Sequence, residues 1–120
     1  MDTALEKNWE VYALKYAVRS DRTRKDSFIF DDHSNDNHTI DYFIWVLKSE
    51  DSIIVVDTGF DYDEAKRRNI PIERSPSEAL KFININSADV TDVIITHLHY
   101  DHAGGLSEFP KANFHLQEDE

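Results

Sequence analysis

The 120-residue sequence contains no cysteine, only three glycines and only three prolines. The absence of cysteine excludes disulfides, thiol nucleophiles and thiolate metal sites, so a bound metal would have to be held by histidine and carboxylate. The shortage of glycine and proline excludes collagen-like and low-complexity chains. No apolar run approaches the roughly 20 residues that span a bilayer, and the first residues contain no apolar signal segment. We therefore expect a cytoplasmic protein with no membrane partner.

Positive charge is also scarce, because 13 Lys+Arg stand against 24 Asp+Glu and give a formal net charge of −11. A protein that neutralises nucleic-acid phosphates needs clustered Lys or Arg, so we expect no nucleic-acid partner. Two Trp, five Tyr and seven Phe are more aromatic residues than a disordered acidic tail contains. This composition and the length fit one small folded domain.

Alternating apolar residues predict three strands in the first half of the sequence, at 9–18, 40–47 and 53–56, the last two joined as a hairpin. The second strand is apolar on both faces, which requires cover on two sides. A polar loop with the apolar residues 28–30 separates the first two strands. The first strand has an apolar face made of Tyr12, Leu14, Tyr16 and Val18.

Helix and strand alternate in the second half. The pattern predicts a helix at 61–69, a second helix opened by the capping box of Ser75 and Glu78, a strand at 93–96, a helix that begins at Gly104 and a strand at 113–116. Strands come first and then alternate with helices. The fold class is therefore α/β, or α+β in some schemes.

Four potential metal ligands lie within six residues, directly after the predicted strand at 93–96: His97, His99, Asp101 and His102. Imidazole and carboxylate are ligands of zinc and similar divalent ions. In an extended segment His97 and His99 project to the same side and can share one ion. Asp101 and His102 lie where the chain turns into a helix, so they can serve a second ion or orient a water. The alternative is a solvated loop that is merely rich in histidine.

The pattern His97-x-His99-x-Asp101-His102 resembles the signature of the metallo-β-lactamase-fold hydrolases, and residues 55–59 resemble the upstream strand motif of that superfamily. Within the superfamily the chain is most similar to the N-acyl homoserine lactonases. This resemblance covers nearly all of the chain from Trp9 onward. It rests on Asp41-Tyr42-Phe43, Val56-Asp57-Thr58-Gly59-Phe60, the segment 93–104, Phe109-Pro110 and Phe114-His115-Leu116-Gln117.

The resemblance implies that His97 and His99 ligate one metal and that Asp101 and His102 ligate a second, with two zinc ions in the complete site. It also implies that Asp57 supports the site by a hydrogen bond to a ligand. The implied fold is the N-terminal half of an αββα sandwich. Residues 1–120 would then be a partial domain, because longer family members take further ligands from later segments. We expect the missing half, or a second copy in a homo-oligomer, as a partner, and little activity from the 120 residues alone.

The implied function is a metal-dependent hydrolase that opens the ring of a small-molecule ester or lactone with a metal-bound hydroxide. Asp101 would pass a proton to the leaving alkoxide. The alternatives are another hydrolase of this fold, such as a β-lactamase or a glyoxalase II-like thioesterase, and a truncated, non-catalytic metal-binding fragment. The remaining histidines, His33, His38 and His115, are predicted to take no part in the metal site.

Overall fold

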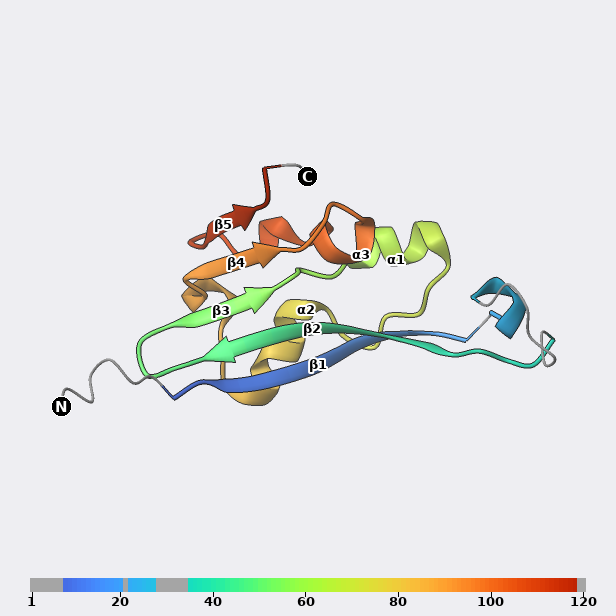
Figure 1. Ribbon diagram of the computed structural model, residues 1–120, viewed down its shortest axis with the longest axis horizontal. Coiled ribbons are helices and arrows are strands. Elements are labelled where there is room, and N and C mark those ends of the chain that lie inside the picture. The colour runs from blue at the N-terminus through green and yellow to red at the C-terminus, as the bar shows by residue number, and fades with distance from the viewer. Residues whose placement is uncertain (1–7, 21, 28–34, 119–120) are drawn as a thin grey trace.

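The computed structural model describes residues 8–20, 22–27 and 35–118 (Figure 1). The five strands are β1 (Glu10–Arg19), β2 (Ile40–Lys48), β3 (Ile53–Val56), β4 (Asp92–Ile95) and β5 (Asn113–Leu116). The three α-helices are α1 (Tyr62–Arg68), α2 (Pro76–Leu80) and α3 (Tyr100–Ala103). Short 3-10 turns are η2 (Arg24–Asp26), η3 (Lys81–Ile83), η4 (Ser87–Asp89) and η5 (Leu106–Glu108).

The strands form one mixed sheet in the order β1-β2-β3-β4-β5. The first three strands are antiparallel, whereas β3, β4 and β5 run parallel. All five predicted strands and the α/β class are thus confirmed. Because β3 and β4 are parallel neighbours, their carboxyl ends meet at the same edge, which is where α/β sheets hold their ligands.

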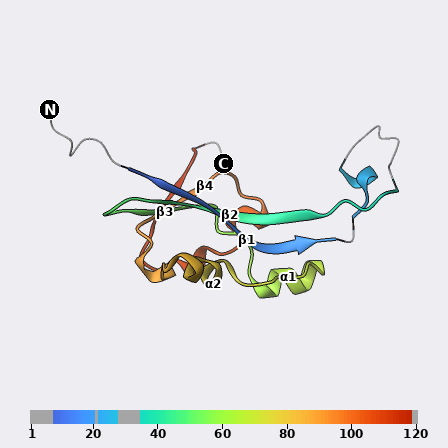
Figure 2. The same cartoon turned by 90° about the horizontal axis from the view of Figure 1, so that it is seen from below.

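Local hydrogen bonds explain where the two longer helices begin. Asp61 caps α1 by accepting a hydrogen bond from Glu64 N at 2.9 Å. Ser75 and Glu78 form the predicted capping box of α2, with Glu78 N donating to Ser75 Oγ at 3.2 Å. Such caps satisfy backbone donors that the first turn leaves without partners. Both helices cover the same face of the sheet (Figure 2).

The core lies between this face and the helices. The alternate residues of β2, Tyr42, Ile44 and Val46, are buried together with Val55 of β3 and Val93 of β4. None of the described helices is long and apolar enough to cross a membrane.

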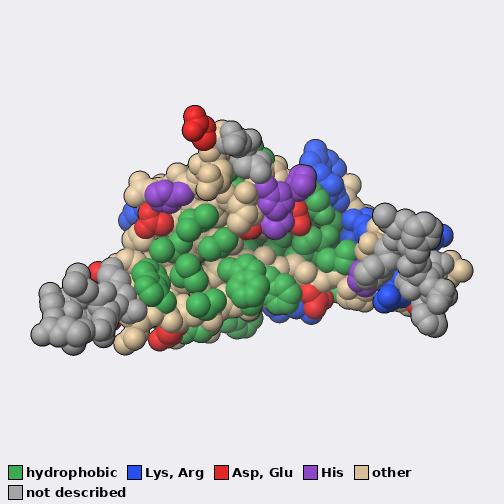
Figure 3. Space-filling view, in the orientation of Figure 1, with side chains coloured by type: hydrophobic (Ala, Val, Ile, Leu, Met, Phe, Trp, Pro, Cys, Tyr) green, Lys and Arg blue, Asp and Glu red, His purple; other side chains and the backbone are tan. Residues whose placement is uncertain are grey.

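The opposite face of the sheet carries no layer among the described residues. Phe43 and Trp45 of β2 are 40% and 47% exposed, and Val11 and Ile94 are also exposed. Figure 3 shows hydrophobic side chains gathered over the strands on this side. The helices therefore cover one of the two apolar faces of β2, and the other face stays exposed.

Two local predictions are wrong. A register shift between Lys15 and Ala17 makes Tyr16 the extra residue of a bulge, so Ala17 faces the core in place of Val18. The predicted helix at Gly104 instead starts earlier, at Tyr100, and ends at Ala103. Residues 28–30 and His33 lie outside the described residues.

Candidate metal centre

The candidate site lies at the carboxyl ends of β3 and β4. Asp57 directly follows β3, and its backbone N donates to Ile94 O of β4 at 2.8 Å. Thr96 and His97 directly follow β4, so the pairing of the two strands brings these residues together. Asp57 has a φ of 64°, in the left-handed region that side chains other than glycine seldom adopt.

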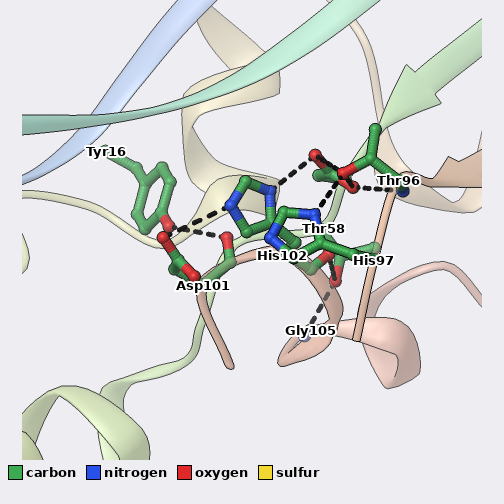
Figure 4. A network of polar contacts seen from close by, with 8 residues as sticks. Tyr16, Thr58, Thr96, His97, Asp101, His102 and Gly105 are labelled. Carbon is green, nitrogen blue, oxygen red and sulfur yellow. Dashed lines mark hydrogen bonds and ion pairs between the residues drawn. The ribbon is translucent and has the colours of Figure 1, made fainter. Parts of the chain in front are cut away.

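The carboxylate of Asp57 is buried. Its two hydrogen-bonding neighbours, Thr96 and His102, are labelled in Figure 4. The backbone N of Thr96 donates to Oδ1 at 2.8 Å. Its side-chain Oγ1 lies 3.0 Å from Oδ1 and 2.9 Å from Oδ2. His102 places Nδ1 at 2.6 Å from Oδ2. Asp57 therefore connects Thr96, at the end of β4, to His102, six residues later in the chain.

The fold brings the predicted ligands into one cluster. The ring of His97 lies 4.0 Å from that of His102 and 4.6 Å from that of His99, measured between centroids. His102 Nε2 is 3.4 Å from Asp101 Oδ2. His99 is the exposed member, whereas His97, Asp101 and His102 are partly buried.

The donor set fits a divalent ion, because uncharged imidazole nitrogens and a carboxylate are its usual ligands in the absence of thiolate. Among the residues that the structure describes, no group of three or more such side chains converges as a metal-holding cluster, since the rings pack against one another. The structure thus brings the predicted residues side by side, with the ring of His97 edge-on to that of His99 and tilted against that of His102.

The backbone of α3 is held by the segment after β3. His102 O accepts hydrogen bonds from Thr58 N at 2.7 Å and Thr58 Oγ1 at 3.2 Å, and Thr58 Oγ1 in turn accepts from Gly105 N at 2.9 Å. Gly104 N donates to Gly59 O at 2.9 Å. The position of His102 is therefore set at its backbone as well as at its ring.

The two adjacent glycines allow this close contact. A Cβ on Gly104 would lie 2.9 Å from Gly59 O, and a Cβ on Gly105 would lie 2.7 Å from Thr58 O. Both glycines therefore make room for backbone against backbone.

Aromatic residues support the site from the core side. Tyr16 donates to Asp101 O at 3.4 Å, and the hydroxyls of Tyr42 and Tyr100 lie 3.2 Å apart. Burial, followed by the hydrogen bond with Tyr42, raises the pKa of Tyr100 to about 12, and burial raises the pKa of Tyr16 still further. At neutral pH both tyrosines are thus protonated hydrogen-bonding groups.

A hollow of about 670 Å³ opens beside His99, between the segment of Leu98 to Gly104 and α1. Arg68 stacks on the ring of Tyr100 at 3.5 Å, and both Arg67 and Arg68 pair with Glu64, which lowers the pKa of that carboxyl. The hollow therefore combines an apolar wall at Leu98 with a charge-balanced one.

The other described histidines lie away from this cluster. His115 is exposed and contacts Asp92 Oδ1 through Nε2 at 2.9 Å, at the far end of β4. His38 Nδ1 lies 2.9 Å from Ser27 Oγ, and both residues belong to the segment that connects β1 to β2.

Sequence reasoning missed three supporting residues, Tyr16, Thr58 and Thr96. Thr58 and Thr96 directly adjoin predicted site residues, which is the one signal that could have indicated them. Tyr16 gave no such signal, because the bulge that directs it toward Asp101 is not visible in the apolar pattern.

Comparison with known proteins decides the family. The model of the metallo-beta-lactamase superfamily matches residues 41–116, which is more than half of the chain. The chain belongs to the metallo-beta-lactamase superfamily. The match covers β2 to β5 and the whole candidate metal centre.

Individual relatives are distant. A hydroxyacylglutathione hydrolase of Saccharophagus degradans is 32% identical over 80 residues, which are 65% of this chain and 24% of that protein. Among solved structures, a probable metal-dependent hydrolase from Staphylococcus aureus has a TM-score of 0.67 at 17% identity, covering 93% of this chain and 48% of that one. A dizinc quorum-quenching lactonase with a bound product has a TM-score of 0.57 at 19% identity, covering 91% and 41%.

The metallo-beta-lactamase fold is shared with both structures over nearly the whole chain. The chain spans about a quarter of the length of the curated relatives it matches and about half of the solved chains.

Proposed function

We propose that this protein is a metal-dependent hydrolase of the lactonase type that acts on a small-molecule ester or lactone. One observation carries the proposal: the Asp57 carboxylate holds His102 by its Nδ1 at 2.6 Å, in the loop where the four potential ligands gather. A carboxylate behind an imidazole is typical of metal-ligating histidines. The fold shared with solved lactonases supports the choice of substrate class.

The residues that would hold metal are His97 and His99 for one divalent ion and Asp101 and His102 for a second, and zinc is the ion that this donor set favours. Bound divalent ions would supply Lewis acidity, which activates water and polarises a carbonyl. The absence of cysteine leaves no thiol nucleophile, in agreement with hydrolysis by activated water.

The chain's own residues would orient the metal ligands and protonate the leaving group. Asp101, whose Oδ2 lies 3.4 Å from His102 Nε2, would carry a proton to the leaving alkoxide. Tyr16 holds the backbone of Asp101, and Thr58 holds that of His102. The hollow beside His99 would receive the substrate, with Leu98 against its apolar part.

The test uses the full-length product of the gene that encodes this chain. After loading with zinc, it is assayed against an N-acyl homoserine lactone, a glutathione thioester and a β-lactam. We expect lactone opening, loss of that activity on chelation and in His97→Ala, and its retention in His115→Ala. Fastest turnover of the thioester or the β-lactam would overturn the lactonase assignment, and metal binding without any turnover would indicate a non-catalytic metal-binding protein.

A glyoxalase II-like thioesterase is the second candidate. It is favoured by the 32% identity over 80 residues with a hydroxyacylglutathione hydrolase. For residues 1–120 expressed alone, we expect weak zinc binding and negligible lactone opening. Catalytic zinc sites generally offer three protein ligands per ion, whereas His97 and His99 supply two.

A cytoplasmic location and the absence of a nucleic-acid partner stay predictions, the latter supported by the net charge of −11.

A further inference from the structure

We propose that Thr96 is a positioning residue that, together with Asp57, fixes the tautomers of His97 and His102 so that both imidazoles present Nε2 to a metal. The purpose of this arrangement rests on the proposed metal-dependent function. The hydrogen bonds themselves stand on the geometry of the protein alone.

The first step concerns the proton between Thr96 and Asp57. Thr96 Oγ1 lies 3.0 and 2.9 Å from the two oxygens of the Asp57 carboxylate. Two oxygens this close need a proton between them, and an ionised carboxylate only accepts hydrogen bonds. The single hydroxyl proton of Thr96 is therefore directed at Asp57.

The second step follows for His97. Thr96 Oγ1 is also 2.9 Å from His97 Nδ1. Because the hydroxyl proton is already used, the oxygen faces His97 as an acceptor, and Nδ1 must carry the ring proton. A neutral imidazole has one N–H, so Nε2 of His97 keeps its lone pair.

The third step gives the same result for His102 by a direct contact. Its Nδ1 lies 2.6 Å from Asp57 Oδ2, whereas its Nε2 lies 3.4 Å from Asp101 Oδ2. The shorter contact takes the single proton of the neutral ring. Both rings therefore leave Nε2 unprotonated. In His102 the Asp57 carboxylate binds the Nδ1 proton directly, and in His97 the Thr96 hydroxyl, which that carboxylate orients, does so.

The molecule contains a ring with the opposite arrangement. His115 contacts Asp92 Oδ1 through Nε2 at 2.9 Å, so its proton is on Nε2. Thr91 offers a matched substitution, because it precedes β4 as Thr96 follows it, and its hydroxyl donates to Ile53 O at 3.0 Å, away from the histidines.

The experiment is long-range proton–nitrogen NMR of the imidazole rings in the metal-free 120-residue chain, at a pH where the rings are neutral. We expect the Nδ1-protonated form for His97 and His102 and the Nε2-protonated form for His115. Thr96→Val should convert His97 to a mixture of tautomers, while Thr96→Ser and Thr91→Val leave it unchanged. An Nε2-protonated His97 in the parent, or no change in Thr96→Val, would overturn the proposal.

A zinc titration of the same variants separates this proposal from the proposed function. We expect Thr96→Val to weaken binding about 10- to 100-fold, as loss of a partner behind a metal ligand typically does, and Thr96→Ser to bind as the parent does. A parent chain that binds no zinc would contradict the weak metal binding expected of residues 1–120, while the metal-free spectra would still decide the tautomers. Unchanged affinity in a folded Thr96→Val would overturn the positioning role.

Discussion

Asp57 has two features that each cost free energy, a left-handed backbone conformation and a buried carboxylate. Its left-handed φ of 64° costs a side chain other than glycine roughly 1 kcal/mol, and its carboxylate is 6% exposed. Glycine would relieve the backbone but could not contact Thr96 and His102. Aspartate tolerates this conformation better than most residues. The strained position thus places a carboxylate beside the two groups that donate to it, Thr96 after β4 and His102 in α3.

At the residue scale, alanine at each histidine separates ligands from bystanders. We expect His97→Ala, His99→Ala and His102→Ala to weaken zinc binding strongly in calorimetric titrations, because each removes a potential ligand from one loop. His115→Ala, with its ring at the other end of β4, is the matched control and should bind as the parent does. Equal losses in His115→Ala and His99→Ala would show that His115 supplies a ligand.

Glu108 gives a prediction on pH. Burial is the main cause that raises the pKa of this carboxyl above its ordinary 4.5, and its Oε2 is buried without a hydrogen-bond partner. A pKa that is higher in the folded state means that folding favours the protonated acid. The stabilising contribution is present below pH 4.5 and is lost as the pH rises through the folded pKa.

We therefore expect Glu108→Gln to raise the melting temperature at pH 7 and to lose this advantage toward pH 4. Circular dichroism melts across this pH range measure it, with the exposed Glu50→Gln as control. A Glu108→Gln variant that is less stable than the parent at pH 7 would show that the hydrogen bond from Ser77 Oγ to Glu108, at 2.8 Å, outweighs the burial of the charge.

At the scale of elements, the sequence predicts what local chemistry determines. The capping box of Ser75 and Glu78 and the alternation in β2 need only neighbouring residues, and both are confirmed. The bulge at Tyr16 and the position of α3 involve distant partners, β2 across the sheet and Thr58 after β3, whose backbone N donates to His102 O. Patterns within one segment contain no information on such partners.

The candidate site divides in the same way. The four potential ligands were predicted because their spacing within one segment is itself the signal. Thr96 was missed because threonine after a strand is common, and its role exists only once β3 lies beside β4. The sequence therefore identifies groups that could ligate a metal better than it identifies groups that would orient them.

The contact between α3 and the segment after β3 is tested at Gly105. The residue has a φ of −121°, which any amino acid adopts, so only space opposes a side chain there. A Cβ would lie 2.7 Å from Thr58 O. We expect Gly105→Ala to lower the free energy of unfolding by about 1–3 kcal/mol, as overpacking does. Urea denaturation measures this, with the exposed Ser107→Ala as control, and unchanged stability would show that the backbone contact relaxes freely.

At the scale of the whole molecule, one face of the sheet is unlike the other. The helices bury one side, whereas Val11, Phe43, Trp45 and Ile94 remain exposed on the second. The apolar pattern of β2 indicates a strand that needs two covers. The described residues supply only one of these covers, the helices. The pattern specifies that a face is apolar but does not specify which element packs on it.

This exposed face predicts association. Contiguous apolar patches beyond a few hundred Å² are rare on monomers and mark interfaces, so we expect the chain to pair with a second copy through this face. The net charge of −11 opposes that pairing, and salt screens the repulsion, so association should increase with ionic strength. Light scattering and the fluorescence of a hydrophobic dye at low micromolar concentration measure both effects.

A matched pair of variants assigns the association to this surface. Trp45→Lys places a charge in the centre of the apolar face and should give a monomer that binds less dye. Phe82→Lys changes an aromatic residue that is even more exposed, at 70% against 47% for Trp45, on the η3 turn that follows α2, and should associate as the parent does. If Phe82→Lys dissociates the oligomer while Trp45→Lys leaves it intact, the interface lies on the helical side. A parent chain that is a compact monomer, binds no dye and melts cooperatively would show that the sheet needs no second cover, because its one buried face would then suffice to hold the fold.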